Sequence, residues 1–441
     1  MHFKPDTVDG SCLRSFAFPC SRVAPFPSLS KMKAFTKLLT PQEARDVYAR
    51  AYAPSPLGTE RVPLAQALRR VLAQEVRAST DLPAFDRSTV DGYAVRAGDT
   101  GRASSGTPLH LQVVGEVLMG EPVRFAVGAG QAARIPTGGM LPEGTDAVVM
   151  QEHTVRTDGT VSVERPVKVY ENVLPRGADV RSGEVIVRPG RRLRPQDLGL
   201  LAGLDIPEVT VYRRPRVAII VTGDELVPPG RSLRGSQIHD MNTYTLSGLI
   251  DESGGIAKPY GIVQDNLALL VERTKLAHRE CEMVILAGGS SVGEKDVVAD
   301  AIAAVGEPGI IVHGIAIRPG KPTILAVAGG KPVFGLPGNV VSAMVIFEQF
   351  VRSVLNAMAG LREPPRPGTT LRARLTRTVA IGDREDHIRV SLAERTGALW
   401  AAPLPGGSAI LTSMVRADGL VTIPANTTLE EGTEVEVRLL G

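Results

Sequence analysis

The sequence predicts a multidomain α/β plus β protein organised around a central doubly wound α/β domain. The chain has 441 residues, which at about 150 residues per domain suggests about three domains. Between residues 216 and 359, continuous apolar runs that suit buried parallel strands alternate with segments of helical length. On either side of this region, short β-like runs alternate with Gly and Pro turns, which favours smaller β-rich domains.

The beginning of the chain combines an atypical segment with two helix signals. Residues 1–31 hold four of the ten Phe and two of the three Cys without any helical or strand period, so we expect a disordered or mis-annotated extension. Thr40-Pro41-Gln42-Glu43 has the capping-box spacing, which predicts a helix start. Apolar residues at helical spacing predict a second helix over 64–72.

The centre of the chain alternates strands with helices. Val217–Val221 and Met283–Ala287 have the continuous apolar character of buried parallel strands. Helices are predicted over 242–252, from Asp296 onward, and over about 339–359. A short helix over 195–203 would pack back onto the first helices, which would make the preceding β-rich segment an insertion.

These patterns divide the chain into five parts. They are the extension over 1–33, a linking helical and extended domain over 34–79 and 178–212, the inserted β-rich domain over 80–177, the α/β domain over 213–360 and a small C-terminal β-barrel over 366–441.

Composition excludes several classes of function. The net charge of +3 is too small to indicate general binding to nucleic acids or to anionic membranes. No continuous apolar run reaches the ~18 residues of a membrane span. Three cysteines outside any C-x-x-C pattern predict neither a disulfide framework nor a zinc site, which favours a reducing, cytoplasmic setting.

Four loops of the α/β domain follow strands, at the edge where such sheets bind ligands. The first, Thr222-Gly223-Asp224-Glu225, offers two carboxylates that could hold a hard cation such as Mg²⁺. A helix N-cap followed by a first-turn acid explains the same residues, and in isolation we would favour that interpretation.

The second loop, residues 288–296, is rich in Gly and opens a helix, which suits anion binding by backbone N–H groups. It is not a phosphate-binding Walker A loop, because Glu294 stands where that motif needs Lys. It also matches G-x-S-x-G, which leaves open a serine hydrolase with Ser291 as its nucleophile.

The third and fourth loops offer cations and helix-start signals. Arg318-Pro319-Gly320-Lys321-Pro322 places two cations around a rigid turn, so an oxyanion partner is plausible beside the alternative of solvated charges. Gly335-Leu336-Pro337-Gly338-Asn339 leads into a helix with Asn339 as an N-cap candidate and Ser342 in the first turn. Outside this domain, residues 81–94 and 134–139 form two further polar loops.

Together these segments resemble the molybdopterin molybdenumtransferases, the MoeA family, which includes the gephyrin E domain. The resemblance covers about residues 34–441. The segments that carry it are DLPAFDRSTVDGYAVR (81–96), RIPTGGMLPEGTDAVVMQE (134–152), PRGADVRSGEVI (175–186), TGDEL (222–226), GGSSVGEKD (288–296), RPGKP (318–322) and GLPGN (335–339).

The resemblance implies the final step of molybdenum cofactor biosynthesis in a molybdopterin-binding α/β domain. Molybdenum from molybdate would be inserted into adenylylated molybdopterin, and AMP would be released in a Mg²⁺-dependent step. It also implies a homodimer in which each cleft is completed by the partner's β domain. Transient contact with a molybdopterin adenylyltransferase and with molybdoenzymes is expected, whereas nucleic-acid and membrane partners are not.

The resemblance also assigns roles to matching positions. Asp224, Asp91 and Lys321 would be catalytic, and Asp224 with Glu225 would hold the metal. Molybdate would bind Arg318, Lys321 and Arg389. The substrate would contact Thr222, Gly223, Gly288, Gly289, Ser291, Gly293, Asp296, Pro319, Gly320, Pro337, Gly338, Asn339, Ser342, Thr137 and Asp179.

Two positions depart from the family's pattern. Arg318 stands where many members have Lys, which keeps the charge and adds bidentate geometry. Val340 replaces a Pro that suits the first helical turn. These changes leave open a paralogue with altered oxyanion preference, such as tungstate, or a non-catalytic molybdopterin-binding scaffold.

Overall fold

The computed structural model describes residues 38–288, 296–362, 370–395 and 397–440. Its first helix, α1 (Pro41–Ala51), begins at the predicted capping box: the Thr40 hydroxyl accepts from the Glu43 amide at 3.2 Å, and the Glu43 carboxylate accepts from the Thr40 amide at 2.8 Å. The predicted extension over 1–33 lies outside the described residues.

The predicted second helix over 64–72 is wrong. Only a 3₁₀ turn forms, at Leu64–Gln66. It directly follows strand β1 (Thr59–Pro63), which pairs antiparallel with β12 (Glu208–Tyr212). Val71 and Leu72 are extended and form bridges to Arg192 and Val211. Leu64 and Leu72, whose spacing suggested a helix, instead pack against residues from 185–212, which include the predicted helix α2 (Pro195–Gly203).

A six-stranded sheet in the order β7-β4-β6-β5-β9-β8 confirms the β-rich character of the segment after residue 80. Its inward-facing residues are small and β-branched, such as Ala132, Val149 and Val161, and all three are fully buried. The strands are β4 (Gly92–Val95), β5 (Leu109–Glu116), β6 (Gln131–Ile135), β7 (Ala147–Met150), β8 (Thr154–Thr157) and β9 (Thr160–Val163).

The α/β domain holds a six-stranded sheet in the order β16-β13-β17-β21-β20-β18. Its first four strands are parallel, whereas β20 runs antiparallel to both of its neighbours, β21 and β18, so the sheet is mixed rather than wholly parallel. The strands are β13 (Arg216–Thr222), β16 (Ile256–Val263), β17 (Met283–Gly288), β18 (Pro308–His313), β20 (Ile324–Ala328) and β21 (Lys331–Leu336).

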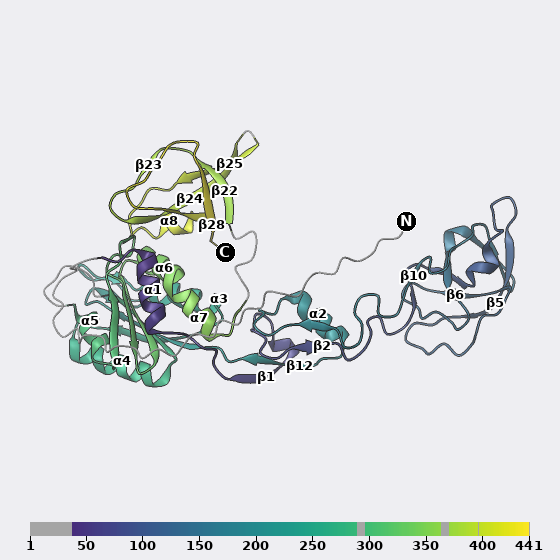
Figure 1. Ribbon diagram of the computed structural model, residues 1–441, viewed down its shortest axis with the longest axis horizontal. Coiled ribbons are helices and arrows are strands. Elements are labelled where there is room, and N and C mark those ends of the chain that lie inside the picture. The colour runs from purple at the N-terminus through teal and green to yellow at the C-terminus, as the bar shows by residue number, and fades with distance from the viewer. Residues whose placement is uncertain (1–37, 289–295, 363–369, 396, 441) are drawn as a thin grey trace, which may run out of the picture. The chain divides into compact units, whose positions relative to one another are not determined.

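Helices cover both faces of this sheet, as the predicted doubly wound arrangement requires (Figure 1). Alternate residues of β13 point to opposite sides: Ile219 packs with α3 (Asn242–Glu252), while Ile220 packs with α4 (Leu267–Glu280) and α5 (Val297–Ala303). The continuous apolar run of β13 is therefore explained by two separate cores.

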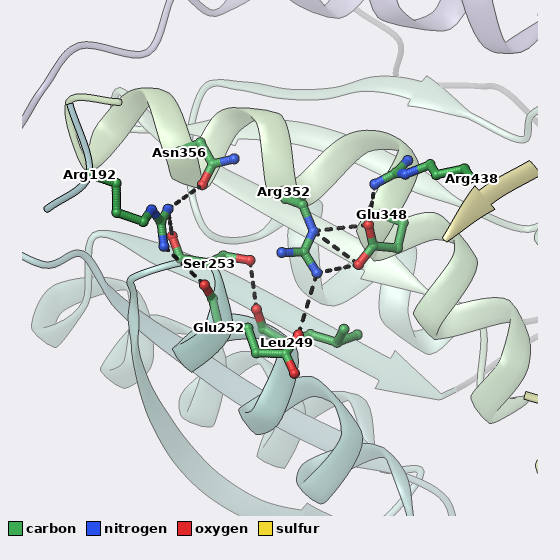
Figure 2. A network of polar contacts seen from close by, with 8 residues as sticks. All are labelled: Arg192, Leu249, Glu252, Ser253, Glu348, Arg352, Asn356 and Arg438. Atoms are coloured by element: carbon green, nitrogen blue, oxygen red, sulfur yellow. Dashed lines mark hydrogen bonds and ion pairs between the residues drawn. The ribbon is translucent and has the colours of Figure 1, made fainter. Parts of the chain in front are cut away.

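A continuous helical segment over 340–358 consists of α6 (Val340–Ile346), a π-helical turn (Phe347–Val351) and α7 (Arg352–Met358). It is the one described helix long and apolar enough to cross a bilayer, but 61% of its window is buried inside the protein. Figure 2 shows the Glu348 carboxylate of the π turn between the guanidinium groups of Arg352 and Arg438. Nearby, Arg192 donates to the carbonyls of the α3 C-terminus.

The C-terminal region is a closed five-stranded barrel, because β24 pairs with both β25 and β26. Its strands are β22 (Thr370–Leu375), β24 (Glu385–Arg395), β25 (Ala398–Pro403), β26 (Gly419–Ile423) and β28 (Glu434–Leu439). A short strand of the α/β domain, β19 (Ile317–Arg318), pairs parallel with β24 and places Arg318 opposite Asp386.

Short elements complete the described structure. They are β2 (Val76–Arg77) with β11 (Val185–Val187), β3 (Arg87–Ser88) with β10 (Val173–Leu174), β14 (Leu226–Val227) with β15 (Ile238–His239), β23 (Val379–Ala380) with β27 (Thr428–Leu429), the helix α8 (Thr412–Val415) and the 3₁₀ turns Ala97–Thr100 and Gln151–His153.

Candidate active site

At the carboxyl ends of β13, β17 and β21, backbone atoms pack closely together and form one surface. Thr222 and Gly288 are register partners at the ends of their strands. A Cβ on Gly288, whose φ is +136°, would lie 2.1 Å from the Thr222 carbonyl oxygen. A Cβ on Gly338 would lie 3.4 Å from the Gly288 Cα. The structure therefore brings these three predicted substrate-contact residues together.

Part of the second loop cannot be placed against this surface. Gly289, Ser291 and Gly293 lie outside the described residues, and so does the hydrolase hypothesis that depends on Ser291.

The loop after β13 is held by a chain of polar contacts. The Thr222 hydroxyl donates to the Asp265 carboxylate at 2.7 Å, and the Asp265 amide donates to the Asp224 carboxylate at 3.1 Å. The Gly223 amide donates to the Val263 carbonyl at 3.3 Å. The strand β14, rather than a helix, follows Asp224, so the interpretation of Asp224 as a helix N-cap is wrong.

The carboxylates at this strand end fit Mg²⁺ only as a partial site. No group of three or more His, Cys, Asp or Glu side chains in the described residues is arranged to hold a metal ion. Asp224 is exposed, and the neighbouring Glu225 carboxylate folds over Gly223, 2.7 Å from the position of a Cβ there. Mg²⁺ is usually held by one or two carboxylates together with water and substrate phosphates, and Asp224 suits that arrangement.

Asp296 caps the helix α5 and contacts the end of β18. One carboxylate oxygen accepts from the Ala299 amide at 3.0 Å, and the other lies 3.3 Å from Nε2 of His313. Burial alone would raise the pKa of Asp296, but the hydrogen bonds from His313 and Ala299 outweigh it and lower the pKa.

A cavity of about 780 Å³ lies between the loops of the α/β domain and the barrel. The α/β domain contributes the Arg318–Pro322 loop and the start of α6, and the barrel contributes β24 and its neighbours. The cavity brings together eight residues predicted from the sequence: Arg318, Pro319, Gly320, Lys321, Pro337, Asn339, Ser342 and Arg389.

Close packing holds the loop that carries the two predicted cations. A Cβ on Gly320, whose φ is +131°, would lie 2.4 Å from Cδ1 of Ile346 in α6. The Thr323 hydroxyl donates to the Gly320 carbonyl at 2.6 Å, and the Ile315 amide donates to the Lys321 carbonyl at 3.0 Å. The backbone of Lys321 is thereby positioned at the cavity wall.

Arg389 is a buried cation in the wall of the same cavity. Its residue is 7% exposed, and it donates to the carbonyls of Gly406 and His387. Its Nε is buried and has no hydrogen-bond partner among the described residues. Burial lowers the pKa of Arg389, which leaves a desolvated donor beside the cavity.

The cavity also holds charged residues that sequence reasoning missed. Besides Arg318, Lys321 and Arg389, its described lining includes Arg377 and Arg384, and Asp386 is the one carboxylate among them. Asp386 lies in β24 within the charged run DREDHIR, shortly before the predicted Arg389. This clustering of charges next to Arg389 is the sequence signal that could have pointed to Arg384 and Asp386.

Asp91 and Thr137 form a separate contact in the β-rich segment. Asp91 accepts from the Thr137 amide at 2.7 Å and from its hydroxyl at 3.0 Å, and these two hydrogen bonds lower the pKa of Asp91. Asp179 is exposed, and its amide donates to the Leu82 carbonyl. None of these three predicted residues belongs to the described lining of the cavity.

Three family models match the chain. They are the MoeA N-terminal region (domain I and II) over residues 39–204, the "Probable molybdopterin binding domain" over 218–357 and the MoeA C-terminal region (domain IV) over 372–440.

Two relatives and a solved structure agree with these matches. The chain is 36% identical to a molybdopterin molybdenumtransferase of Nostoc sp., over 86% of this chain and 88% of the relative. It is 37% identical to a molybdopterin molybdenumtransferase of Haemophilus influenzae, over 71% of this chain and 76% of the relative. The crystal structure of a molybdopterin biosynthesis MoeA protein from Pyrococcus horikoshii superposes with a TM-score of 0.76 at 31% identity, over 92% of this chain and all of that chain.

Proposed function

Because this chain belongs to the MoeA family of molybdopterin molybdenumtransferases, which act in molybdenum cofactor biosynthesis, we propose that it inserts molybdenum from molybdate into adenylylated molybdopterin and releases AMP. The observation that carries the proposal is the cation-rich cavity beside the strand ends, whose lining includes Arg318, Lys321 and Arg389. A tetrahedral oxyanion needs several donors of positive charge in a partly desolvated place, and this cavity supplies them.

The oxyanion would be bound by groups that are already positioned. The guanidinium of Arg389 is buried, so little conformational entropy is lost when it donates to a ligand. Arg318 provides a planar donor pair where many family members have Lys, and Lys321 provides a point charge on a fixed loop.

The adenylylated substrate would lie along the strand ends of the α/β domain. Thr222, Gly288 and Gly338 offer a backbone surface to which a pterin or phosphate group can approach closely. Asp224, with Glu225 beside it, would hold Mg²⁺, which when bound neutralises phosphate charge as the phosphoanhydride breaks. Gly289, Ser291, Gly293 and Asp296 remain predicted contacts to the substrate.

Residues of the β-rich segment would complete the site from a second copy of the chain. Asp91 is held in its ionised form by Thr137, which suits a carboxylate that faces a metal-bound or cationic group. We propose a homodimer in the cytoplasm, in which Asp91, Thr137 and Asp179 reach the partner's cleft. Transient contact with a molybdopterin adenylyltransferase and with molybdoenzymes would transfer substrate and product.

The decisive measurement is molybdate-dependent release of AMP from adenylylated molybdopterin in the presence of Mg²⁺. We expect Asp224→Ala to reduce the rate by at least about a hundredfold, because it removes the proposed metal ligand. Asp251→Ala is the matched control: Asp251 is an exposed acid of α3 that pairs with Arg214 at 3.3 Å, so the rate should be unchanged.

Two outcomes would contradict the proposal. If the wild-type protein bound the substrate but released no AMP with either molybdate or tungstate, the non-catalytic scaffold hypothesis would replace it. If release were equally fast without either oxyanion, the site would be a hydrolase, and Ser291→Ala would become the next variant to measure.

A further inference from the structure

An internal carboxylate lies beside the proposed oxyanion cations. Asp386 is 6% exposed, and its Oδ2 lies 3.3 Å from Nε of Arg318. The contact is built into the backbone, because β19 pairs with β24 and places Arg318 and Asp386 opposite each other. The α/β domain thus brings the cation to the barrel's carboxylate.

Asp386 lies among several cationic side chains. Arg318 faces it from β19, Arg389 belongs to its own strand, and Arg384 precedes that strand. The imidazole of His387 in the same strand lies 3.0 Å from the Glu385 carboxylate, and the register partner of Asp386 on β26 is the apolar Ile423. Among the described lining residues of the cavity Asp386 is the one carboxylate, set against five cations. Asp386 is therefore the internal counter-anion of the group of cations that we assign to the oxyanion.

A bound oxyanion would compete with this counter-anion for the same guanidinium groups. Molybdate and tungstate are fully ionised dianions at neutral pH and carry no proton to share with a carboxylate. Two neighbouring negative charges in a partly buried place repel each other strongly, and protonation of one of them relieves the repulsion. The group able to accept that proton is Asp386.

We propose that Asp386 couples oxyanion binding to proton uptake: the carboxylate neutralises the cations while the cavity is free of oxyanion, and it takes up a proton when a fully ionised oxyanion binds Arg318 and Arg389. This inference rests on the proposed function of the cavity as the oxyanion site. Burial raises the pKa of Asp386 in spite of the opposing effect of Arg318 and Arg389, which favours the protonated form.

The coupling makes affinity depend on pH in a defined direction. Oxyanion binding raises the pKa of Asp386 further, so the complex holds more protons than the free protein in the range between the two pKa values. Affinity should therefore increase as pH falls through that range, by up to about tenfold per pH unit if one full proton is taken up. Asp386 acts here as a positioning residue, through the Arg318 guanidinium with which it pairs.

Calorimetric titration of the full-length protein with molybdate alone tests the proposal. Titrations in buffers of different ionisation enthalpy, from about pH 6 to about pH 8, count the protons taken up per molybdate. For the wild type we expect uptake approaching one proton. For Asp386→Asn we expect no uptake, an affinity independent of pH, and binding at the alkaline end at least about fivefold tighter than in the wild type.

Asp383→Asn is the matched control. The Asp383 carboxylate is 88% exposed and pairs with Arg384 at 3.6 Å, so the substitution removes a carboxylate just before β24 without affecting the buried contact of Asp386. This variant should bind molybdate with the wild-type affinity and the wild-type proton count.

The outcomes separate this inference from the function on which it rests. Molybdate binding to the wild type without proton uptake, or a wild-type proton count in Asp386→Asn, would overturn the role of Asp386 while the oxyanion site stands. If the wild type bound neither molybdate nor tungstate, the oxyanion site itself would be wrong and this inference with it. If Asp386→Asn fails to fold, the proposal is tested by Asp386→Ser and by the number of protons that the wild type takes up per molybdate.

Discussion

The carboxylate of Asp296 joins the first turn of α5 to the end of β18. It caps the Ala299 amide at 3.0 Å and lies 3.3 Å from the His313 ring. An N-cap carboxylate of this kind typically contributes about 1 kcal/mol to stability. The geometry shows that Asp296 is a helix cap, whereas its contact with the substrate stays a prediction.

We predict that Asp296→Ala destabilises the protein by about 1 kcal/mol at neutral pH, whereas Asp296→Asn, which can still cap, costs less than half of that. Because the folded state lowers the pKa of Asp296, its ionised form stabilises the fold above the ordinary pKa and loses that effect as pH falls through the folded value. Thermal unfolding should therefore show the wild type and Asp296→Ala converging in acid. Divergence in acid would contradict this account.

The helical segment over 340–358 connects the cavity to the barrel. Its N-cap residue Asn339 and its first-turn residue Ser342 line the cavity, and its π turn contains Glu348. The Glu348 carboxylate contacts Arg352 and lies 2.5 Å from Arg438 of β28, with its side chain 10% exposed (Figure 2). π-helical turns are rare within α-helices, and here Glu348 within the turn contacts Arg438 of the barrel.

We predict that Glu348→Ala destabilises the protein by about 2 kcal/mol, because it leaves two guanidinium groups without their shared carboxylate in a partly buried place. Glu434→Ala is the control within the barrel: its pair with Arg372 is exposed on both sides and should contribute less than about 0.5 kcal/mol. Thermal unfolding compares the two variants. If both variants lost the same free energy of unfolding, the contact of Glu348 would contribute no more to stability than an exposed ion pair does.

At the scale of the whole molecule, the predicted catalytic residues are divided among segments that are distant in the sequence. Asp224 lies at the end of β13, and Lys321 lines the cavity shared with the barrel. Asp91 belongs to the β-rich segment and is absent from the described lining of that cavity. In the proposed homodimer, Asp91 of one chain and Asp224 of the other complete one site.

This arrangement predicts complementation between inactive variants. Asp91→Ala and Asp224→Ala should each lack molybdate-dependent AMP release, but dimers mixed from the two contain one intact site. Random mixing of equal amounts should therefore restore about a quarter of the wild-type activity, since half of the dimers are mixed and each has one working site of two. Activity that stays absent after subunit exchange, verified by mass spectrometry of the mixed dimers, would place both residues in one chain.

Much of the architecture follows from local pattern and could be predicted. The capping box before α1, the Pro and Gly bounding α2, and the apolar runs of β13 and β17 are each decided by neighbours in the sequence. The predicted helix over 64–72 failed because Val71 and Leu72 bridge to distant partners, and no local signal reports such partners. The reversed direction of β20, which pairs antiparallel with both β21 and β18, likewise could not be predicted from the pattern alone.

The loops of the candidate site could be recognised from the sequence, but their arrangement around one cavity could not. The residues of the Arg318–Pro322 loop and of the start of α6 could be named from the sequence because Gly, Pro and charged residues that follow a strand are recognisable there. That they share a cavity with Arg377, Arg384 and Asp386 depends on the pairing of β19 with β24, a contact between residues almost seventy positions apart. Sequence patterns are local, whereas burial and charge pairing depend on which surfaces meet in space, and so the counter-anion role of Asp386 emerged only from the folded chain.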